Sequence, residues 1–339
     1  MAIYMWREPT EIIIYKFKAF NWKIIIPIWW LNHSWWYWSY NWKVSIDWWQ
    51  ETTYSGTWSS WGSIQLSWYN TWQEYEVTIS PVTEWYWWAL CFWWMNVTYS
   101  SMLTEIVYDG SYMWYWESAT STWNRFRQNQ YRWCTWLIKI PDEVLPVTVT
   151  SVWDNFRTWQ YYWCTSLTTP ANEVFPNTIT SIWNYFRQSQ YSWCTSLTVP
   201  ANELLSTVTT IWSSFRYATY YGCTNLTYAA EEVLPNSVTT IWDYFRWEQY
   251  QNCTALSEIK WWKDKNIGAS YYRQDQFNWC TTNKTVKVLS DVWYRAYSNN
   301  TLPNSYVTTV SVPSTYLSNF INASNPPRSV ITDSKFVWY

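Results

Sequence analysis

Six of the seven cysteines recur at almost constant spacing, and this regularity constrains the fold more than any other feature of the chain. The intervals are 30, 30, 29, 30 and 27 residues, between Cys134, Cys164, Cys194, Cys223, Cys253 and Cys280. A zinc site needs cysteine pairs about two to four residues apart, and small disulfide scaffolds have denser, irregular spacing. One cysteine per interval therefore indicates an array of repeats of about 30 residues.

Other residue types recur in register with the cysteines. Each of five copies has a leucine three residues after its cysteine, and the copies share a phenylalanine column and an arginine column: Phe126, Phe156, Phe186, Phe215 and Phe245, then Arg127, Arg157, Arg187, Arg216, Arg246 and Arg273. A unit of this size cannot bury its apolar side chains alone, so neighbouring copies must stack and share a core. The pattern predicts a repeat solenoid over residues 118–300.

Local signals predict the elements within each coil. Residues 178–182 and 238–241 alternate Thr with Val or Ile, which is typical of a short strand. A second short strand is expected around the leucine that follows each cysteine. Asp154 and Asn184 stand where a helix N-cap would, so we expect one short helical turn in each coil as well.

These repeats resemble the BspA-like leucine-rich repeats of bacterial surface proteins. The matching motifs are Cys-Thr-Ser-Leu-Thr at residues 164–168 and 194–198, and Leu-Pro-Asn-Ser-Val-Thr-Thr-Ile at residues 234–241. The resemblance covers residues 118–300, and the stretch 310–337 is similar to the closing segment of that family. It implies a leucine-rich-repeat type of solenoid, with short strands and short helical turns, in a protein at the cell surface. The family's usual unit is several residues shorter than this one.

Tryptophan is unusually frequent, with 37 Trp against only 5 Gly. The residue before each repeat cysteine is Trp133, Trp163, Trp193, Gly222, Asn252 or Trp279. Trp, Gly and Asn do not share a packing site, but Gly and Asn are the usual occupants of a left-handed turn position. We therefore hypothesise that most Trp are glycines encoded by UGA, translated with a code in which UGA means Trp. The resembled family has Gly in this column.

A second column supports the same hypothesis but leaves an alternative. It contains Trp123, Trp153, Trp183, Trp212 and Trp242, with Gly268 close to it in the sixth copy. The resembled family again has Gly here. If the tryptophans are genuine, they are typical of an aromatic surface that binds sugars or membrane interfaces.

The rest of the chain divides into three further segments. Residues 1–40 are unassigned, and residues 301–339 are expected to form a C-terminal cap. Residues 41–110 alternate β-branched and polar side chains, which predicts a β-sandwich-like or capping β domain with strands at 43–46, 63–66, 75–79, 97–99 and 105–108. Such a domain would cover the open end of the solenoid. The longest unbroken apolar runs are too short for a membrane span, and no secretory signal is recognised.

Charge and chemistry exclude several classes of function. The formal net charge of −2 lacks the basic footprint of a nucleic-acid binder, and the single histidine, His33, excludes His-based catalytic triads. No nucleotide, calcium or hydrolase motif is present, so we expect neither an enzyme nor a cofactor. The cysteine column is interpreted as buried free thiols rather than metal or redox ligands. The arginine column is interpreted as pairing with carboxylates or carbonyls rather than binding anions; the candidate carboxylates are Glu143, Glu173, Glu203 and Glu232.

The favoured function is non-enzymatic adhesion or recognition at the cell surface, with a protein or glycan as partner. A solenoid offers an extended face whose outward residues vary from coil to coil. Alternation from each leucine places on that face Trp136, Ile138, Ser166, Thr168, Ser196, Thr198, Asn225, Thr227, Ala255 and Ser257. Small hydroxyl residues are also what a solvated sheet carries by default. The alternatives are a carbohydrate-binding module, if the Trp are genuine, and a hydrolase, for which no acid–base pair is visible.

Overall fold

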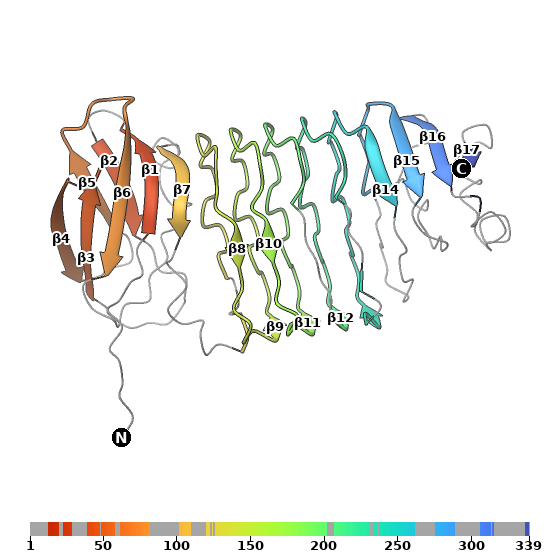
Figure 1. The fold of residues 1–339 in the computed structure, drawn as a ribbon, viewed down its shortest axis with the longest axis horizontal. Helices are drawn as coiled ribbons and strands as arrows, with labels where there is room; N and C mark the ends of the chain where they lie inside the picture. Colours follow the sequence, from red (N-terminus) through yellow and green to blue (C-terminus); the bar gives the residue numbers. More distant parts are fainter. Residues whose placement is uncertain are drawn as a thin grey trace, which may run out of the picture.

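The computed structural model shows an elongated β protein in which two N-terminal sheets precede a stack of coils (Figure 1). The described residues contain no α-helix. No helix of the described chain is long and apolar enough to cross a membrane. The structure describes residues 13–19, 23–28, 39–47, 49–57, 62–81, 102–109, 120–122, 124, 126–201, 207–230, 234–235, 237–261, 275–288, 306–312, 314 and 336–338.

The N-terminal region is built from antiparallel strands. A five-stranded sheet has the order β4-β3-β6-β1-β7, and a separate pair joins β2 to β5. The bounds are β1 Ile13–Lys18, β2 Lys23–Ile28, β3 Ser39–Ile46, β4 Trp49–Thr57, β5 Gly62–Ser67, β6 Glu74–Pro81 and β7 Leu103–Asp109. Alternate side chains of β1 point into the core, where Tyr15 and Phe17 are fully buried.

Four of the five strands expected in this region lie within β3, β5, β6 and β7, and residues 97–99 lie outside the described residues. Strands β1, β2 and β4 were not expected. Strand β1 pairs with both β6 and β7, so residues 13–18 of the unassigned N-terminal segment form an inner strand of the sheet.

The repeats form a β-solenoid of about four turns, which confirms the coarse prediction of a repeat solenoid. One ladder has the order β13-β12-β11-β9, in parallel register, and a second ladder joins β10 to β8. The strands are only two residues long: β8 Glu143–Val144, β9 Ser151–Val152, β10 Glu173–Val174, β11 Ser181–Ile182, β12 Thr210–Ile211 and β13 Thr240–Ile241. The expected strand around each leucine is not formed, because Leu167 closes a tight turn onto the Cys164 carbonyl.

The short helical turn expected in each coil is not confirmed. In the second coil, φ is positive at Asn155, Arg157 and Trp159, and residues in the left-handed region cannot continue a right-handed helix. From residue 158 on, successive backbone N–H groups donate alternately to a carbonyl of their own turn and to a carbonyl of the next coil. Trp159 donates to the Gln188 carbonyl of the next coil at 2.9 Å, whereas Thr158 donates to Asn155 across a tight turn at 3.3 Å. The segment is therefore a run of turns bonded to its neighbouring coils.

Two apolar ladders run along the solenoid axis. One contains the cysteine and leucine columns together with a tyrosine column, and it is continuous with the core of the N-terminal sheets. The tyrosine column consists of Tyr131, Tyr161, Tyr191, Tyr220 and Tyr250. The other contains the phenylalanine column and the Val and Ile residues of the short strands. Equivalent rings stack on one another: Tyr161 and Tyr191 have centroids 5.4 Å apart, as do Phe156 and Phe186. The cysteine, leucine and phenylalanine columns repeat one residue type in register, whereas the short strands contribute either Val or Ile.

The N-terminal sheet contacts the first coil directly. Ile138 donates a backbone hydrogen bond to Thr104 at 2.8 Å, and Ile106 donates one to Lys139 at 3.0 Å. The hydroxyls of Tyr15 and Tyr131 are 2.9 Å apart. Strand β7 thus pairs in parallel with the first coil at Lys139.

At the same junction, Glu105 accepts hydrogen bonds from Lys16 at 2.6 Å and from Lys139 at 2.8 Å. Burial opposes ionisation of Glu105, but the hydrogen bonds from the two lysines hold its pKa below the ordinary 4.5. Its contribution to stability is therefore present above pH 4.5 and is lost as the pH falls through the lower, folded-state pKa. The carboxylate links the sheet to the first coil.

We expect Glu105→Gln to lower the free energy of unfolding by about 1 kcal/mol. The ion pair with the exposed Lys139 contributes little to this value, and the ion pair with the half-buried Lys16 contributes more. The loss should shrink at about 1 M salt, where the charges are screened. Urea unfolding at two salt concentrations measures it. The control is Glu258→Gln, at an exposed position. An equal loss in both variants would contradict a specific role for Glu105.

The C-terminal part continues the parallel arrangement. Strands β14 (Glu258–Trp261), β15 (Lys284–Val288), β16 (Val307–Val312) and β17 (Phe336–Trp338) pair in this order. Strands β16 and β17 lie in the segment expected to form a C-terminal cap, and they extend the sheet beyond the last cysteine. Most of the residues between these strands lie outside the described residues.

Candidate functional surfaces

The residues expected to form the binding face do lie at the surface, one set in each coil. The buried leucines alternate with them, as at Leu167 and Leu197, which are fully buried. Ile138 is 50% exposed. The exposed members also include Thr168, Thr198, Asn225, Thr227 and Ser257, while Trp136, Ser166, Ser196 and Ala255 are half-buried. We call this set the post-cysteine face.

The hydroxyl groups of the post-cysteine face are used within the solenoid. Thr227 donates to the Thr198 carbonyl at 3.1 Å, and Ser257 donates to the Thr227 carbonyl at 3.3 Å. Each bond joins one coil to the coil before it. The face therefore offers methyl groups and hydroxyl lone pairs to a partner, because the hydroxyl hydrogens point along the axis.

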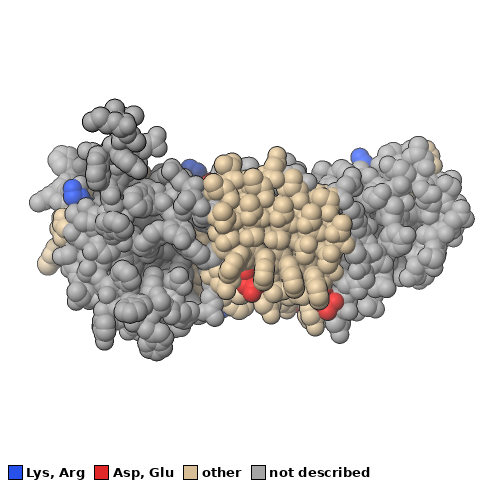
Figure 2. Space-filling view, turned by 90° about the horizontal axis from the view of Figure 1, so that it is seen from below, with Lys and Arg blue, Asp and Glu red and all other residues tan. Residues whose placement is uncertain are grey.

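The Trp column after the short strands forms a stack at the surface. Trp153 and Trp242 are 42% and 46% exposed. Ring centroids of successive coils are 5.9, 5.4 and 5.1 Å apart from Trp153 through Trp183 and Trp212 to Trp242. Figure 2 shows the side of the solenoid on which β9, β11 and β12 lie, and its described surface has few charged side chains. Successive indoles of this column therefore stack on one another while staying partly exposed.

The residue before each repeat cysteine is left-handed in every coil. The values of φ are 65°, 64° and 63° at Trp133, Trp163 and Trp193, and 71°, 65° and 61° at Gly222, Asn252 and Trp279. The expectation of a left-handed turn position in this column is confirmed.

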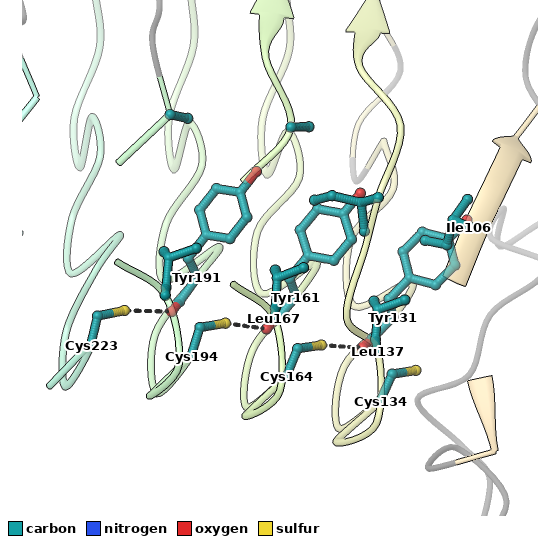
Figure 3. Close-up of a cluster of buried hydrophobic side chains, with 14 of the residues drawn as sticks. Ile106, Tyr131, Cys134, Leu137, Tyr161, Cys164, Leu167, Tyr191, Cys194 and Cys223 are labelled. Atoms are coloured by element: carbon teal, nitrogen blue, oxygen red, sulfur yellow. Dashed lines mark hydrogen bonds between the residues drawn. The ribbon is translucent and has the colours of Figure 1, made fainter. Parts of the chain in front are cut away.

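The six repeat cysteines are buried free thiols. Figure 3 shows Cys134, Cys164, Cys194 and Cys223 in a column. Each Sγ from the second coil onward points to the carbonyl of a tyrosine or equivalent residue in the preceding coil; Cys164 donates to Tyr131 and Cys194 to Tyr161, both at 3.1 Å. Burial raises the pKa of the Cys194 thiol to about 12. The described residues contain no group of three His, Cys, Asp or Glu side chains arranged to hold a metal ion. The geometry fits a core role for these cysteines.

The arginine column is buried beside the phenylalanine column. Arg157, Arg187 and Arg246 are 1–2% exposed. The guanidinium carbons of Arg157 and Arg246 lie 4.7 and 4.8 Å from the ring centroids of the preceding phenylalanines. The side chains of Glu143, Glu173, Glu203 and Glu232 lie outside the described ones, so the expected pairing stays a prediction. His33 also falls outside the described residues.

A second surface was not anticipated. On the turn segment, the columns that begin with Asn155 and Thr158 vary strongly between coils: one reads Asn155, Tyr185, Ser214 and Tyr244, and the other reads Thr158, Gln188, Tyr217 and Trp247. Tyr185 is 43% exposed. Trp247 stacks on both Tyr217 and Tyr244, with centroids 5.1 Å apart. Thr158 and Ser214 in these columns are buried. The remaining residues reach the surface, and we call them the turn face: Asn155, Tyr185, Gln188, Tyr217, Tyr244 and Trp247. Column-by-column variation was the signal that could have found it.

The fold and its repeating surface columns define a β-solenoid repeat protein. No known protein family and no curated protein matches the chain.

Proposed function

We propose that this chain is a non-enzymatic recognition or adhesion protein that binds a protein or glycan partner along its solenoid. The observation that carries the proposal is the contrast between the core and the surface columns. The core repeats apolar side chains at matching positions in every coil, whereas a column that reaches the surface, Trp136, Ser166, Ser196, Asn225 and Ala255, changes from coil to coil. A constant scaffold with varied exposed residues is how repeat proteins recognise partners.

The family and the location belong to the same proposal. The Cys-Thr-Ser-Leu-Thr motifs at residues 164–168 and 194–198 support a BspA-like leucine-rich-repeat relationship, and that relationship supports a place at the cell surface or in secreted form. Buried thiols are compatible with an oxidising compartment, because in-register cysteines that all bond to the preceding coil point the same way rather than toward each other.

The stacked Trp column gives less support to a carbohydrate-binding module. Sugars bind aromatic side chains through the ring face. Here Trp183 and Trp212 each stack between two neighbouring indoles, so neither of these rings offers an open face to a sugar.

The proposal is tested with the full chain on two arrays, one of immobilised oligosaccharides and one of immobilised purified extracellular proteins. We expect saturable binding to members of one array. A lysine introduced on the face that contacts the partner should weaken that binding by at least about tenfold, since an unpaired charge in an interface is costly. A lysine on the other face should leave the binding unchanged. The variants are Thr198→Lys for the post-cysteine face and Tyr185→Lys for the turn face.

Thr180→Lys is the matched control, because Thr180 is also exposed but lies on neither face. Circular dichroism confirms that all three variants keep the fold. Absence of saturable binding on both arrays, or equal binding by all variants, would contradict the proposal.

A further inference from the structure

The left-handed column before the repeat cysteines carries an inference that goes beyond the proposed function. All six residues of this column have φ between 61° and 71°. In that region the Cβ atom of an ordinary residue approaches the following carbonyl oxygen, and glycine alone avoids the contact. Gly222 and Asn252 are the residue types that tolerate it best. Trp133, Trp163, Trp193 and Trp279 are not.

The arginine column is left-handed as well, with φ of 52–54°, but Arg157, Arg187 and Arg246 are buried in the solenoid. Packing compensates less at the exposed tryptophans, although Trp163 stacks on Trp193 with ring centroids 6.1 Å apart. Trp163 and Trp279 are 44% and 63% exposed, so much of each indole lies in water. At the fourth coil, a Cβ atom added to Gly222 would lie 2.7 Å from Cε3 of Trp193. Glycine throughout the column would satisfy both φ and the spacing between coils.

A second, unrelated turn has the same combination. Between β5 and β6, Trp68 and Trp72 have φ of 80° and 71° and are 92% and 57% exposed. Two bulky residues in the left-handed region within a five-residue turn are rare, whereas two glycines there are ordinary. The N-terminal sheets thus lead to the same conclusion as the repeats.

We infer that the tryptophans in the left-handed region are glycines in the natural protein, specified by UGA codons that its source organism reads as glycine. They are Trp68, Trp72, Trp133, Trp159, Trp163, Trp193 and Trp279. The ordinary glycine codons would then stand at Gly222 and the other four glycines. The inference concerns the chemistry of the turns and is independent of which partner the solenoid binds.

The direct test is the residue mass in the natural protein. The protein is purified from its source, denatured and digested with trypsin, and the peptide spanning residues 188–216 is fragmented in a mass spectrometer. We expect the mass of glycine at position 193 and a UGA codon in the gene. A tryptophan mass at 193, or UGG codons at 133, 163 and 193, would overturn the inference.

The physical argument is tested separately on recombinant protein with the sequence as written. Trp163→Gly should raise the melting temperature by about 2–4 °C, because it removes the left-handed Cβ contact. Trp163→Asn should give part of this gain, because asparagine tolerates the left-handed region and already occupies the equivalent position at Asn252. Trp153→Gly is the matched control, since Trp153 is equally exposed but its φ is not positive. It should leave the melting temperature unchanged or lower it. A similar decrease in both glycine variants would refute the argument from φ.

Discussion

Replacing Phe186 by alanine should lower the free energy of unfolding by about 3–5 kcal/mol. Phe186 is fully buried, and its ring stacks between Phe156 at 5.4 Å and Phe215 at 5.2 Å. The substitution removes the transfer free energy of the ring, leaves a cavity in the middle of the ladder and breaks two aromatic contacts. Denaturant unfolding followed by fluorescence and circular dichroism measures the loss.

The control for this prediction is Phe186→Leu, which keeps an apolar side chain in the ladder. We expect it to cost about 1–2 kcal/mol, since most of the apolar volume is kept and only the stacking is lost. The difference in the free energy of unfolding between the two variants then measures the cost of removing the remaining apolar volume and leaving a cavity. A loss below about 1 kcal/mol for Phe186→Ala would show that this column does not hold the coils together.

The thiols of Cys194 and Cys280 should react about 1,000-fold more slowly than ordinary cysteines at pH 8, and the other buried repeat thiols should also react slowly. Only the thiolate reacts, and burial raises the pKa of Cys194 and of Cys280 to about 12 from the ordinary 9. Burial also raises the pKa of Cys164, Cys223 and Cys253. A maleimide reagent should therefore label the six repeat thiols slowly in the native protein and all seven cysteines after denaturation without reductant. Fewer than five labelled after denaturation would indicate bridges or bound metal.

The same thiols make the fold sensitive to alkali. Above about pH 9 the thiols of the unfolded chain ionise, whereas Cys194 and Cys280 in the folded chain stay protonated until about pH 12. The folded state then holds more protons, so stability is fully present below pH 9 and falls as the pH rises, by about 1.4 kcal/mol per pH unit for each thiol. Cys194→Ala should show a shallower fall between pH 9 and 11. An unchanged slope would mean that Cys194 is not protonated and buried as described.

The two core ladders could be predicted because a fixed period and an apolar residue type are sufficient for stacking. Cys164 and Cys194 recur at the interval of one coil, and identical residues in register must lie in a column once the coils stack. The outward direction of Thr168 and Thr198 followed from alternation about buried leucines. None of these expectations depended on the path of the chain between the columns.

The turn segment could not be predicted, because its conformation depends on the neighbouring coils. Asp154 looked like a helix N-cap, which accepts a hydrogen bond from its own segment. In the structure its Oδ1 accepts the backbone N–H of Asn184 in the next coil at 2.9 Å, and Asn184 in turn accepts that of Ser213 at 3.1 Å. Strand β1 was missed for a similar reason, since both of its partners lie far along the sequence.

The coil-to-coil hydrogen bonds also determine how the molecule responds to force. Each coil of a solenoid is bonded only to the coils on either side, so tension along the axis acts on one interface at a time. A coil of about 30 residues occupies about 5 Å of the stack and spans about 100 Å when extended. Each coil that is released therefore lengthens about twentyfold, while the remaining coils keep their surface columns intact.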